Sequence, residues 1–208
     1  MGKVEENKRI KRVAILDAAL QLFTDKGWSN TSISDIAARS GVAKGTFYLY
    51  FKDKYDIRNK LVVYQSRRLL KAAYEDMLAA GIKELSQQLI FIADHVLDRL
   101  QQRKDLLILI SKNLSWGILK QELSRTEPEE GEADFIRDFH ALTESQNIRP
   151  LDSEILLYLL SELIGSACYS AILYSEPCSL EALKPHLFEA VRRIVEQFIE
   201  RAAEEAQA

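Results

Sequence analysis

Apolar residues recur every three or four positions along most of the chain, which is the spacing of one face of a helix. Ile15, Ala19, Leu22 and Phe23 form such a stripe and predict a first helix over about 7–26, with Gly27 as its stop. Asp53 precedes a long helix expected over 54–80. Later stripes predict helices over about 82–103, 104–123, 133–146 and 152–175, and a last one starting near Ser179 in which Pro185 marks a bend or a fresh first turn.

The stretch 32–54 predicts two short helices and the tight turn between them. Ser32 and Asp35 have the spacing of a capping box, with Asp in place of the usual Glu or Gln. Gly41 stands where a helix can end through a left-handed residue. A second helix is predicted to start at Ala43 and to run through 43–51. Phe47 and Phe51 share its buried face because they are four residues apart.

The opposite face of this second helix carries a cation, a glycine, hydroxyls and aromatic rings, and has no acid before Asp53. Such side chains suit phosphates and base edges in a major groove. Gly45 is a poor helix former, which suggests that a partner approaches its backbone closely. The pattern predicts a helix-turn-helix that binds double-stranded DNA through Lys44, Gly45, Thr46, Tyr48, Leu49, Tyr50 and Lys54, together with Thr31 and Ser32.

These residues resemble the tetracycline-repressor (TetR) family of bacterial transcriptional regulators. The resemblance covers about residues 10–60 and rests on the motifs 35–37, 41–42, 44–46, Tyr48, Phe51 and Lys52-x-Lys54. Position 43, often a Ser or Thr that caps the helix and touches phosphate in the family, is Ala43 here, so no DNA role is assigned to it. The alternative is a packed three-helix unit that makes no DNA contact.

Composition supports this picture mainly through an asymmetry of charge. Residues 1–60 hold 12 Lys and Arg against 7 Asp and Glu, an excess of +5, whereas the remainder has a balance of −8 within a net charge of −3. A cationic front on an acidic body suits a protein that meets a polyanion with one end.

The hydropathy of the chain predicts a cytoplasmic protein without a membrane segment. No uninterrupted apolar run approaches the roughly 18 residues of a membrane span. No secretory signal is visible, and two cysteines are too few for a disulfide framework.

The last two helices predict self-association. Ser161, Gly165, Cys168 and Ile172 form one stripe of the first helix, and Leu187, Val191, Ile194 and Phe198 form a stripe of the second. Two helices alone could not cover both stripes, so a four-helix interface between two copies is expected. The family resemblance implies the same homodimer.

The region after residue 52 offers few signals of chemistry. Polar groups embedded in apolar helices nominate His95, Asn113, Trp116 and Tyr158 as candidate effector-binding residues, although each also suits an ordinary core or surface position. No third or fourth ligand stands at metal-binding spacing, and no nucleophile elbow or phosphate loop occurs. We therefore expect no metal, no cofactor and no catalytic residue, and an enzyme is the weakest alternative.

The sequence thus predicts an all-α fold: an N-terminal helix-turn-helix DNA-binding domain (1–52) followed by a helical-bundle domain (53–208) for effector binding and dimerisation. The predicted function is a transcriptional regulator, by family precedent a repressor, that binds a palindromic operator as a homodimer and is released by a small-molecule effector. The alternative is an architectural or protein-partnered adaptor on DNA without an effector.

Overall fold

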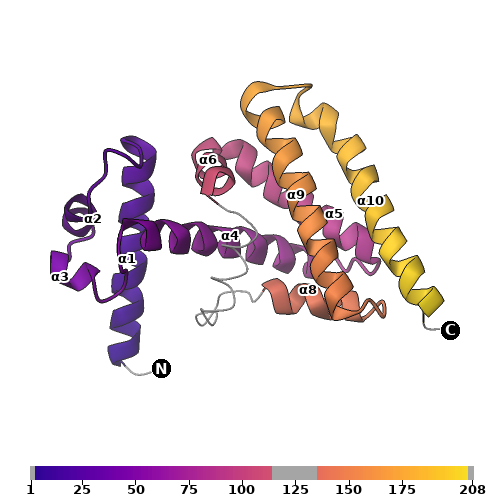
Figure 1. Cartoon of the computed structure of the whole chain (residues 1–208), viewed down its shortest axis with the longest axis horizontal. Helices are drawn as coiled ribbons and strands as arrows, with labels where there is room; N and C mark the ends of the chain where they lie inside the picture. The colour runs from indigo at the N-terminus through magenta and orange to yellow at the C-terminus, as the bar shows by residue number, and fades with distance from the viewer. Residues whose placement is uncertain (1–2, 114–134, 206–208) are drawn as a thin grey trace. The chain divides into compact units, whose positions relative to one another are not determined.

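The computed structural model describes residues 3–113 and 135–205, and these residues form helices and their connections without any strand. The described helices, labelled in Figure 1, are α1 (Lys3–Asp25), α2 (Ile33–Arg39), α3 (Lys44–Phe47), α4 (Lys54–Ala79), α5 (Leu85–Gln102), α6 (Lys104–Asn113), α8 (Phe135–Glu144), α9 (Pro150–Tyr174) and α10 (Leu180–Glu205). The predicted all-α fold, with a helix-turn-helix head and a helical body, is confirmed.

The described residues divide into two compact units, one holding residues 3–64 and the other holding residues 65–112 and 135–205. We call them the head and the body. The division falls inside α4, so the first turns of this helix belong to the head. The predicted domain boundary after residue 52 lies just before α4 and stays a prediction.

The head is built around the C-terminal half of α1, which packs against α2, while α2 packs against α3. Ile15, Leu16 and Ala19 of α1 are fully buried, as are Ile36 of α2 and Phe47 of α3. Burying each of the larger side chains contributes about 1.5–3 kcal/mol, which is why three short helices can hold one another in place.

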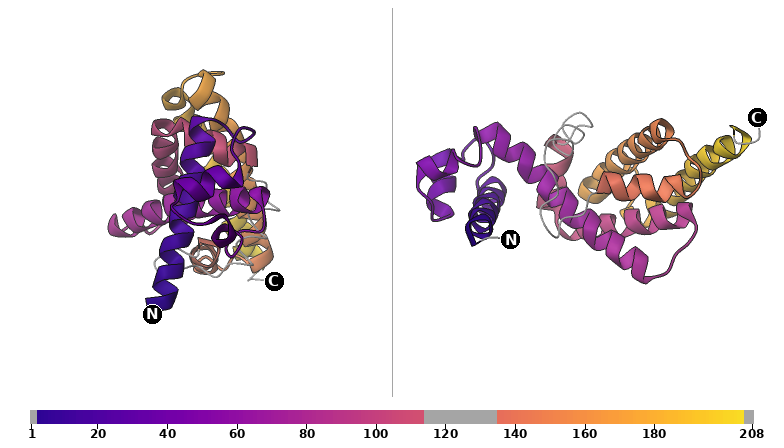
Figure 2. Two further views of the ribbon diagram at one scale, coloured as in Figure 1. Left: turned by 90° about the vertical axis from the view of Figure 1, so that its left-hand side faces the viewer. Right: turned by 90° about the horizontal axis from the view of Figure 1, so that it is seen from below.

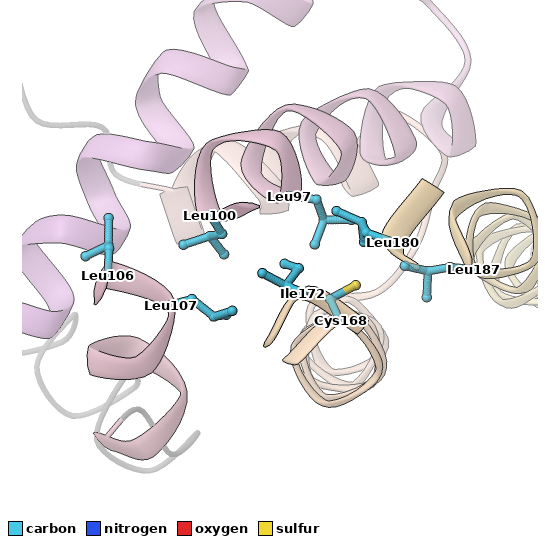
Figure 3. Close-up of a cluster of buried hydrophobic side chains, with 8 residues drawn as sticks. All are labelled: Leu97, Leu100, Leu106, Leu107, Cys168, Ile172, Leu180 and Leu187. Atoms are coloured by element: carbon cyan, nitrogen blue, oxygen red, sulfur yellow. The ribbon is translucent and has the colours of Figure 1, made fainter. Parts of the chain in front are cut away.

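The body is a bundle in which α10 packs against α5 and α9, and α8 packs against α9. In both Figure 1 and Figure 2, α9 and α10 run side by side. A buried cluster joins α5, α6, α9 and α10, as Figure 3 shows; its members are Leu97, Leu100, Leu106, Leu107, Cys168, Ile172, Leu180 and Leu187.

An ion-pair cluster at the rim of this core joins α10 to α5. The Nζ atom of Lys184 lies 2.8 Å from the carboxylate of Asp94 and also pairs with Asp98. Burial alone would lower the pKa of Lys184, but the hydrogen bonds to both carboxylates outweigh it and raise the pKa above its ordinary value. The cluster therefore keeps a cation in a largely covered position and fixes α10 against α5.

Helix α3, which the sequence predicts over 43–51, is shorter in the structure. Regular helix ends at Phe47, and the N–H groups of Leu49 and Tyr50 then donate to carbonyls three residues back, as in a tight 3₁₀-type turn. Phe51 still reaches the core and is 1% exposed. Asp53 accepts hydrogen bonds from the N–H groups of Tyr55 and Asp56, so a new helix cap starts immediately afterwards.

One part of the sequence argument for self-association is wrong. Cys168, Ile172, Leu187, Val191 and Phe198 are buried within a single chain, because α5, α9 and α10 cover one another's apolar stripes. The large apolar side chains that α9 leaves exposed are Ile155, Tyr158, Leu159 and Tyr174.

One described helix bears on the hydropathy expectation, which stays a prediction. Within the described residues, Asp152–Tyr174 of α9 is long and apolar enough to cross a membrane by length and composition, although small and charged residues interrupt its apolar run. A core helix of a water-soluble bundle passes the same test, and α9 packs against α8 and α10. About a third of its most apolar window is buried, and the described chain covers the rest only in part.

Candidate nucleic-acid interface

The turn between α2 and α3 is built from a cap at one end and a left-handed glycine at the other. Ser32 Oγ accepts a hydrogen bond from the Asp35 N–H, and the Asp35 carboxylate accepts one from the Ser32 N–H at 2.8 Å, so the predicted capping box is present. Gly41 has φ +70°, a conformation that a side chain disfavours. The N–H of Val42 then donates to the Ala37 carbonyl, which closes the turn and sets the direction of α3.

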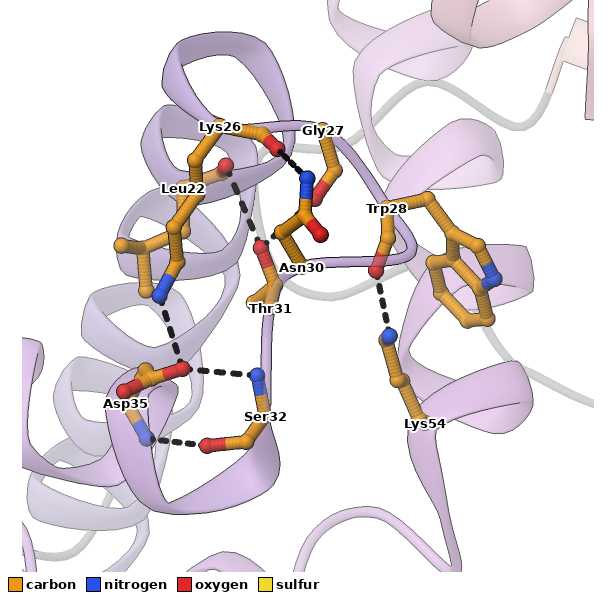
Figure 4. Close-up of polar contacts among 9 residues, drawn as sticks. All are labelled: Leu22, Lys26, Gly27, Trp28, Asn30, Thr31, Ser32, Asp35 and Lys54. Carbon is orange, nitrogen blue, oxygen red and sulfur yellow. Dashed lines mark hydrogen bonds and ion pairs between the residues drawn. The ribbon is translucent and has the colours of Figure 1, made fainter.

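Asp35 also ties the turn to α1, as Figure 4 shows. Lys26 Nζ lies 2.8 Å from its Oδ2 atom. The hydrogen bond from Lys26, followed by those of Ser32, holds the pKa of Asp35 well below its ordinary value. Asp35 is therefore ionised at neutral pH, and these contacts orient α2 and, through it, α3.

The segment from Lys44 to Tyr50, which we call the recognition segment, has two distinct sides. Phe47 is fully buried and packs against Phe51 with the two rings tilted and their centroids 5.5 Å apart. Lys44, Gly45, Tyr48 and Leu49 are exposed, with exposed fractions of 50% for Tyr48 and 81% for Leu49. Thr46 and Tyr50 are partly covered. A cation, a glycine, a phenol and a large apolar side chain thus face outward together.

Gly45 has a different environment from the glycines that end helices. Its backbone is helical, and an added methyl group would meet no atom within 4 Å. Neither backbone conformation nor packing within the chain therefore requires a glycine here. This agrees with the sequence interpretation that space is kept for a partner.

Three of the predicted contact residues have internal roles in the head. The Thr31 hydroxyl is buried within hydrogen-bonding distance of the Gly27 and Leu22 carbonyls, at 2.9 and 3.2 Å. Ser32 is exposed and caps α2, and a hydroxyl that accepts a hydrogen bond can still donate its own hydrogen. Lys54 donates to the Trp28 carbonyl (Figure 4), and its ammonium lies 4.4 Å from the centroid of the Trp28 ring.

The candidate effector residues do not form one described site. His95 lies between α5 and α4, with Nδ1 3.3 Å from an Asp76 carboxylate oxygen. Tyr158 lies on α9, and 41% of its surface is exposed. Trp116 and the side chain of Asn113 lie outside the described residues. No group of three or more metal-binding side chains occurs in the described ranges.

Sequence reasoning missed two buried polar residues of α4. Gln65 and Ser66 are 6% and 8% exposed, and neither Gln65 Nε2 nor Ser66 Oγ has a hydrogen-bond partner. His95 Nε2 is buried and unpartnered in the same way. Buried polar groups are normally paired, so these atoms call for a partner. The sequence could have signalled Gln65 and Ser66, since they follow the apolar run 61–63 in a helix.

A pocket among the described residues lies elsewhere in the body, between the start of α9 and the end of α10. Its lining includes Ile148, Arg149, Phe198 and Arg201, and its free volume is about 10 Å³, the space of roughly one water molecule. It is too small for an effector.

A helix-turn-helix head with an outward cationic and aromatic segment, carried by a helical body, defines a class of bacterial regulators. Residues 15–61 match the family model for bacterial regulatory proteins of the tetR family. The head therefore carries the DNA-binding domain of the TetR family.

Individual relatives support the same assignment over different lengths. The fatty acid metabolism regulator protein of Bacillus subtilis is 38% identical over 72 residues, which are 35% of this chain and 37% of that protein. The uncharacterized HTH-type transcriptional regulator YdgC of Bacillus subtilis is 26% identical over 183 residues, 86% of this chain and 88% of YdgC. Alignments with the first three curated relatives cover 27% to 51% of those proteins.

Among solved structures, the transcriptional regulator FadR of Bacillus subtilis in complex with stearoyl-CoA has a TM-score of 0.62 at 20% identity. The match covers 86% of this chain and 96% of the FadR chain. At this identity the likeness establishes the fold.

The environment of Gly45 generates a test that separates folding from partner binding. Gly45→Ala should raise the stability of the head by up to about 1 kcal/mol, because alanine is the better helix former and meets no clash. The same variant should bind duplex DNA at least several-fold more weakly if a backbone approaches this position. Thermal unfolding and fluorescence anisotropy measure the two effects. Unchanged DNA affinity in the stabilised variant would show that the glycine is not kept for DNA.

Proposed function

We propose that the chain is a DNA-binding transcriptional regulator that binds a palindromic operator as a homodimer and represses transcription until a small-molecule effector releases it. The recognition segment is the observation that carries this proposal. Its buried side anchors Phe47 in the head, and its exposed side offers Lys44, Tyr48 and Leu49 to a partner. Lysine suits phosphate, whereas a phenol and an apolar side chain suit base edges and thymine methyl groups. Under this proposal the protein is cytoplasmic and has no enzymatic activity.

Two substitutions on the exposed side test DNA binding. Lys44→Ala should remove a phosphate contact, weaken binding about equally for all sequences and flatten the salt dependence by about one unit of slope. Tyr48→Ala should weaken binding to the preferred sequence more than to random DNA. The duplex is selected by the wild-type protein from a random library, and affinities are measured by anisotropy from low to high salt.

Lys83→Ala serves as the matched control, because Lys83 is an exposed lysine of the body. All three variants should unfold at nearly the wild-type temperature. Wild-type affinity and salt slope in both head variants, or failure of the wild type to select any sequence, would contradict the proposal.

The homodimer proposal rests on the exposed face of α9. Ile155, Tyr158 and Leu159 are each 41% exposed, and the exposed Gly165 and Ser166 follow one to two turns later on the same side. Small residues allow another helix to approach closely, and the apolar residues give it surface to bury. A second copy of this chain offers the same face, as a two-fold interface requires. Two heads held about one DNA turn apart would then read two half-sites.

A charge placed on this face should separate the subunits. Leu159→Glu should convert a dimer to a monomer, because an unpaired carboxylate would be buried at the interface. Leu78→Glu, on an α4 leucine that is 55% exposed, is the control and should leave the dimer intact. Light scattering after gel filtration reports the mass, and thermal unfolding reports the fold. A dimeric, folded Leu159→Glu protein, or a monomeric wild type, would refute this interface.

The effector proposal rests on unpaired polar atoms inside the body. Gln65 Nε2 offers a donor, Ser66 Oγ offers a donor and an acceptor, and His95 Nε2 can serve as either. A small molecule with polar groups would satisfy atoms that otherwise cost about 1–3 kcal/mol each when buried alone. Long-chain acyl-CoA is the class to examine first, because the FadR structure contains stearoyl-CoA.

One observation favours the adaptor alternative. The described pocket near Ile148 and Arg149 is far smaller than the few hundred Å³ that effector sites usually provide. An adaptor without an effector would have a solid body and would respond to a protein partner.

Titration with stearoyl-CoA distinguishes these two readings, with coenzyme A alone as the control. A ligand that binds only the folded state raises the unfolding temperature, and the rise grows with the ratio of ligand concentration to Kd. An effector must also lower DNA affinity, and DNA must lower effector affinity by the same factor. We expect both effects to be smaller in Gln65→Leu. No stabilisation and no loss of DNA affinity would reject acyl-CoA as the effector.

A further inference from the structure

The N-terminal half of α1 extends beyond the core of the head. The first buried residue of the chain's described part is Ile15, so none of residues 3–14 is buried although all are helical. We call residues 3–12 the N-terminal arm; ten helical residues span about 15 Å. Figure 1 shows this part of α1 continuing past α3 toward the N-terminus. Packing against the core does not explain why the chain extends the helix this far.

The arm is strongly cationic for its length. It holds five cations, Lys3, Lys8, Arg9, Lys11 and Arg12, against Glu5 and Glu6. The two acids pair with cations one turn later: Lys8 Nζ and Arg9 Nη2 each lie 2.8 Å from a glutamate oxygen. The pair of Lys8 with Glu5 is exposed and that of Arg9 with Glu6 is partly covered. Exposed ion pairs contribute little to stability.

The arm lies close to the recognition segment. Both belong to the same compact unit, and Figures 1 and 2 draw α3 next to the N-terminal half of α1. Lys8 has a raised pKa, mainly through its hydrogen bond to Glu5. Since Tyr50 ends the recognition segment, the cations of the arm continue the surface that begins at Lys44.

We propose that the N-terminal arm is a second DNA-contacting element, which binds the phosphate backbone beside the groove that receives the recognition segment. This inference rests on the proposed DNA-binding function and adds a contact surface to it. Duplex DNA is the occupant that the charge favours, because each phosphate neutralised by Lys or Arg releases a bound counterion. Glu5 and Glu6 weaken the attraction and so limit binding to sequences that the recognition segment does not accept.

A membrane surface fits the arm less well. A helix that lies in a lipid interface needs one continuous apolar face. The exposed large apolar residues of the arm are Val4 and Ile10, which six residues place about 120° apart around the helix. Within the arm, neither has a second apolar residue three or four positions away on its own side. The arm is therefore basic around its circumference rather than amphipathic.

The test removes three lysines of the arm and compares the result with an equal change of charge elsewhere. The variant Lys3→Gln/Lys8→Gln/Lys11→Gln should lose up to about three units of salt slope and bind the selected duplex about tenfold to hundredfold more weakly at physiological salt. The control Lys83→Gln/Lys104→Gln/Arg192→Gln removes three exposed cations of the body. It should keep nearly the whole slope.

A change of opposite sign guards against damage to the fold. Glu5→Gln/Glu6→Gln should bind random-sequence duplex more tightly and discriminate less between random and selected DNA. Hydroxyl-radical footprinting should show deoxyribose positions of the backbone that are protected in the wild type and become reactive in the triple-lysine variant. Circular dichroism confirms that both variants are folded.

The outcomes separate this inference from the function on which it rests. A wild-type protein that selects no sequence contradicts the proposed function itself. A wild type that binds its selected duplex, together with a triple-lysine variant of equal slope and footprint, overturns the arm proposal alone. Equal losses in the arm variant and the body control would also overturn it, because the effect would then be one of net charge.

Discussion

The burial of Phe47 is the constraint on which the recognition segment depends. A helix of only four residues cannot form alone, because nucleation costs more than so few hydrogen bonds return. The ring of Phe47 is fully covered and packs against the tilted ring of Phe51, so the head core holds the segment from one side. The outward direction of Tyr48 and Leu49 follows from that anchor, since neighbouring helical positions point to different sides. Under the proposed function, folding and DNA recognition therefore share one short stretch of chain.

Helices α1 and α4 also combine two roles, each in a different part of the helix. The C-terminal half of α1 supplies the buried Ile15, Leu16 and Ala19, whereas its N-terminal half carries cations and buries nothing. Helix α4 begins in the head, where Lys54 contacts Trp28, and continues into the body, where Gln65 and Ser66 are buried. Each of these helices thus couples a structural task to a region that can meet a partner.

Local rules predicted the head well because its signals act over a few residues. The capping box of Ser32 and Asp35 and the left-handed Gly41 both follow from hydrogen bonds and backbone sterics within one turn. The length of α3 was overestimated, because helical spacing alone did not show that the chain tightens into a turn between Phe47 and the cap at Asp53. Periodicity also could not show that Thr31 and Lys54 find partners inside the head.

The body was harder to predict for a physical reason. An apolar stripe on a helix predicts that its side chains will be covered but does not predict which helix covers them. Leu187 and Val191 therefore suggested a subunit interface, whereas both are buried within the chain. Average hydropathy has the same weakness in α9. Function in the body depends on what reaches buried polar atoms such as Gln65 Nε2 and Ser66 Oγ.

Under the proposed function, those atoms limit how an effector can act. A ligand shifts a two-state equilibrium only through its differential affinity for the two states. Satisfying one or two buried polar atoms is worth about 1–3 kcal/mol each, which matches the usual size of allosteric coupling. A single hydrogen bond to Gln65 that exists in only one state could therefore account for much of the coupling. Because Gln65 shares a helix with Lys54, a modest shift of α4 is the most direct physical route between effector and head.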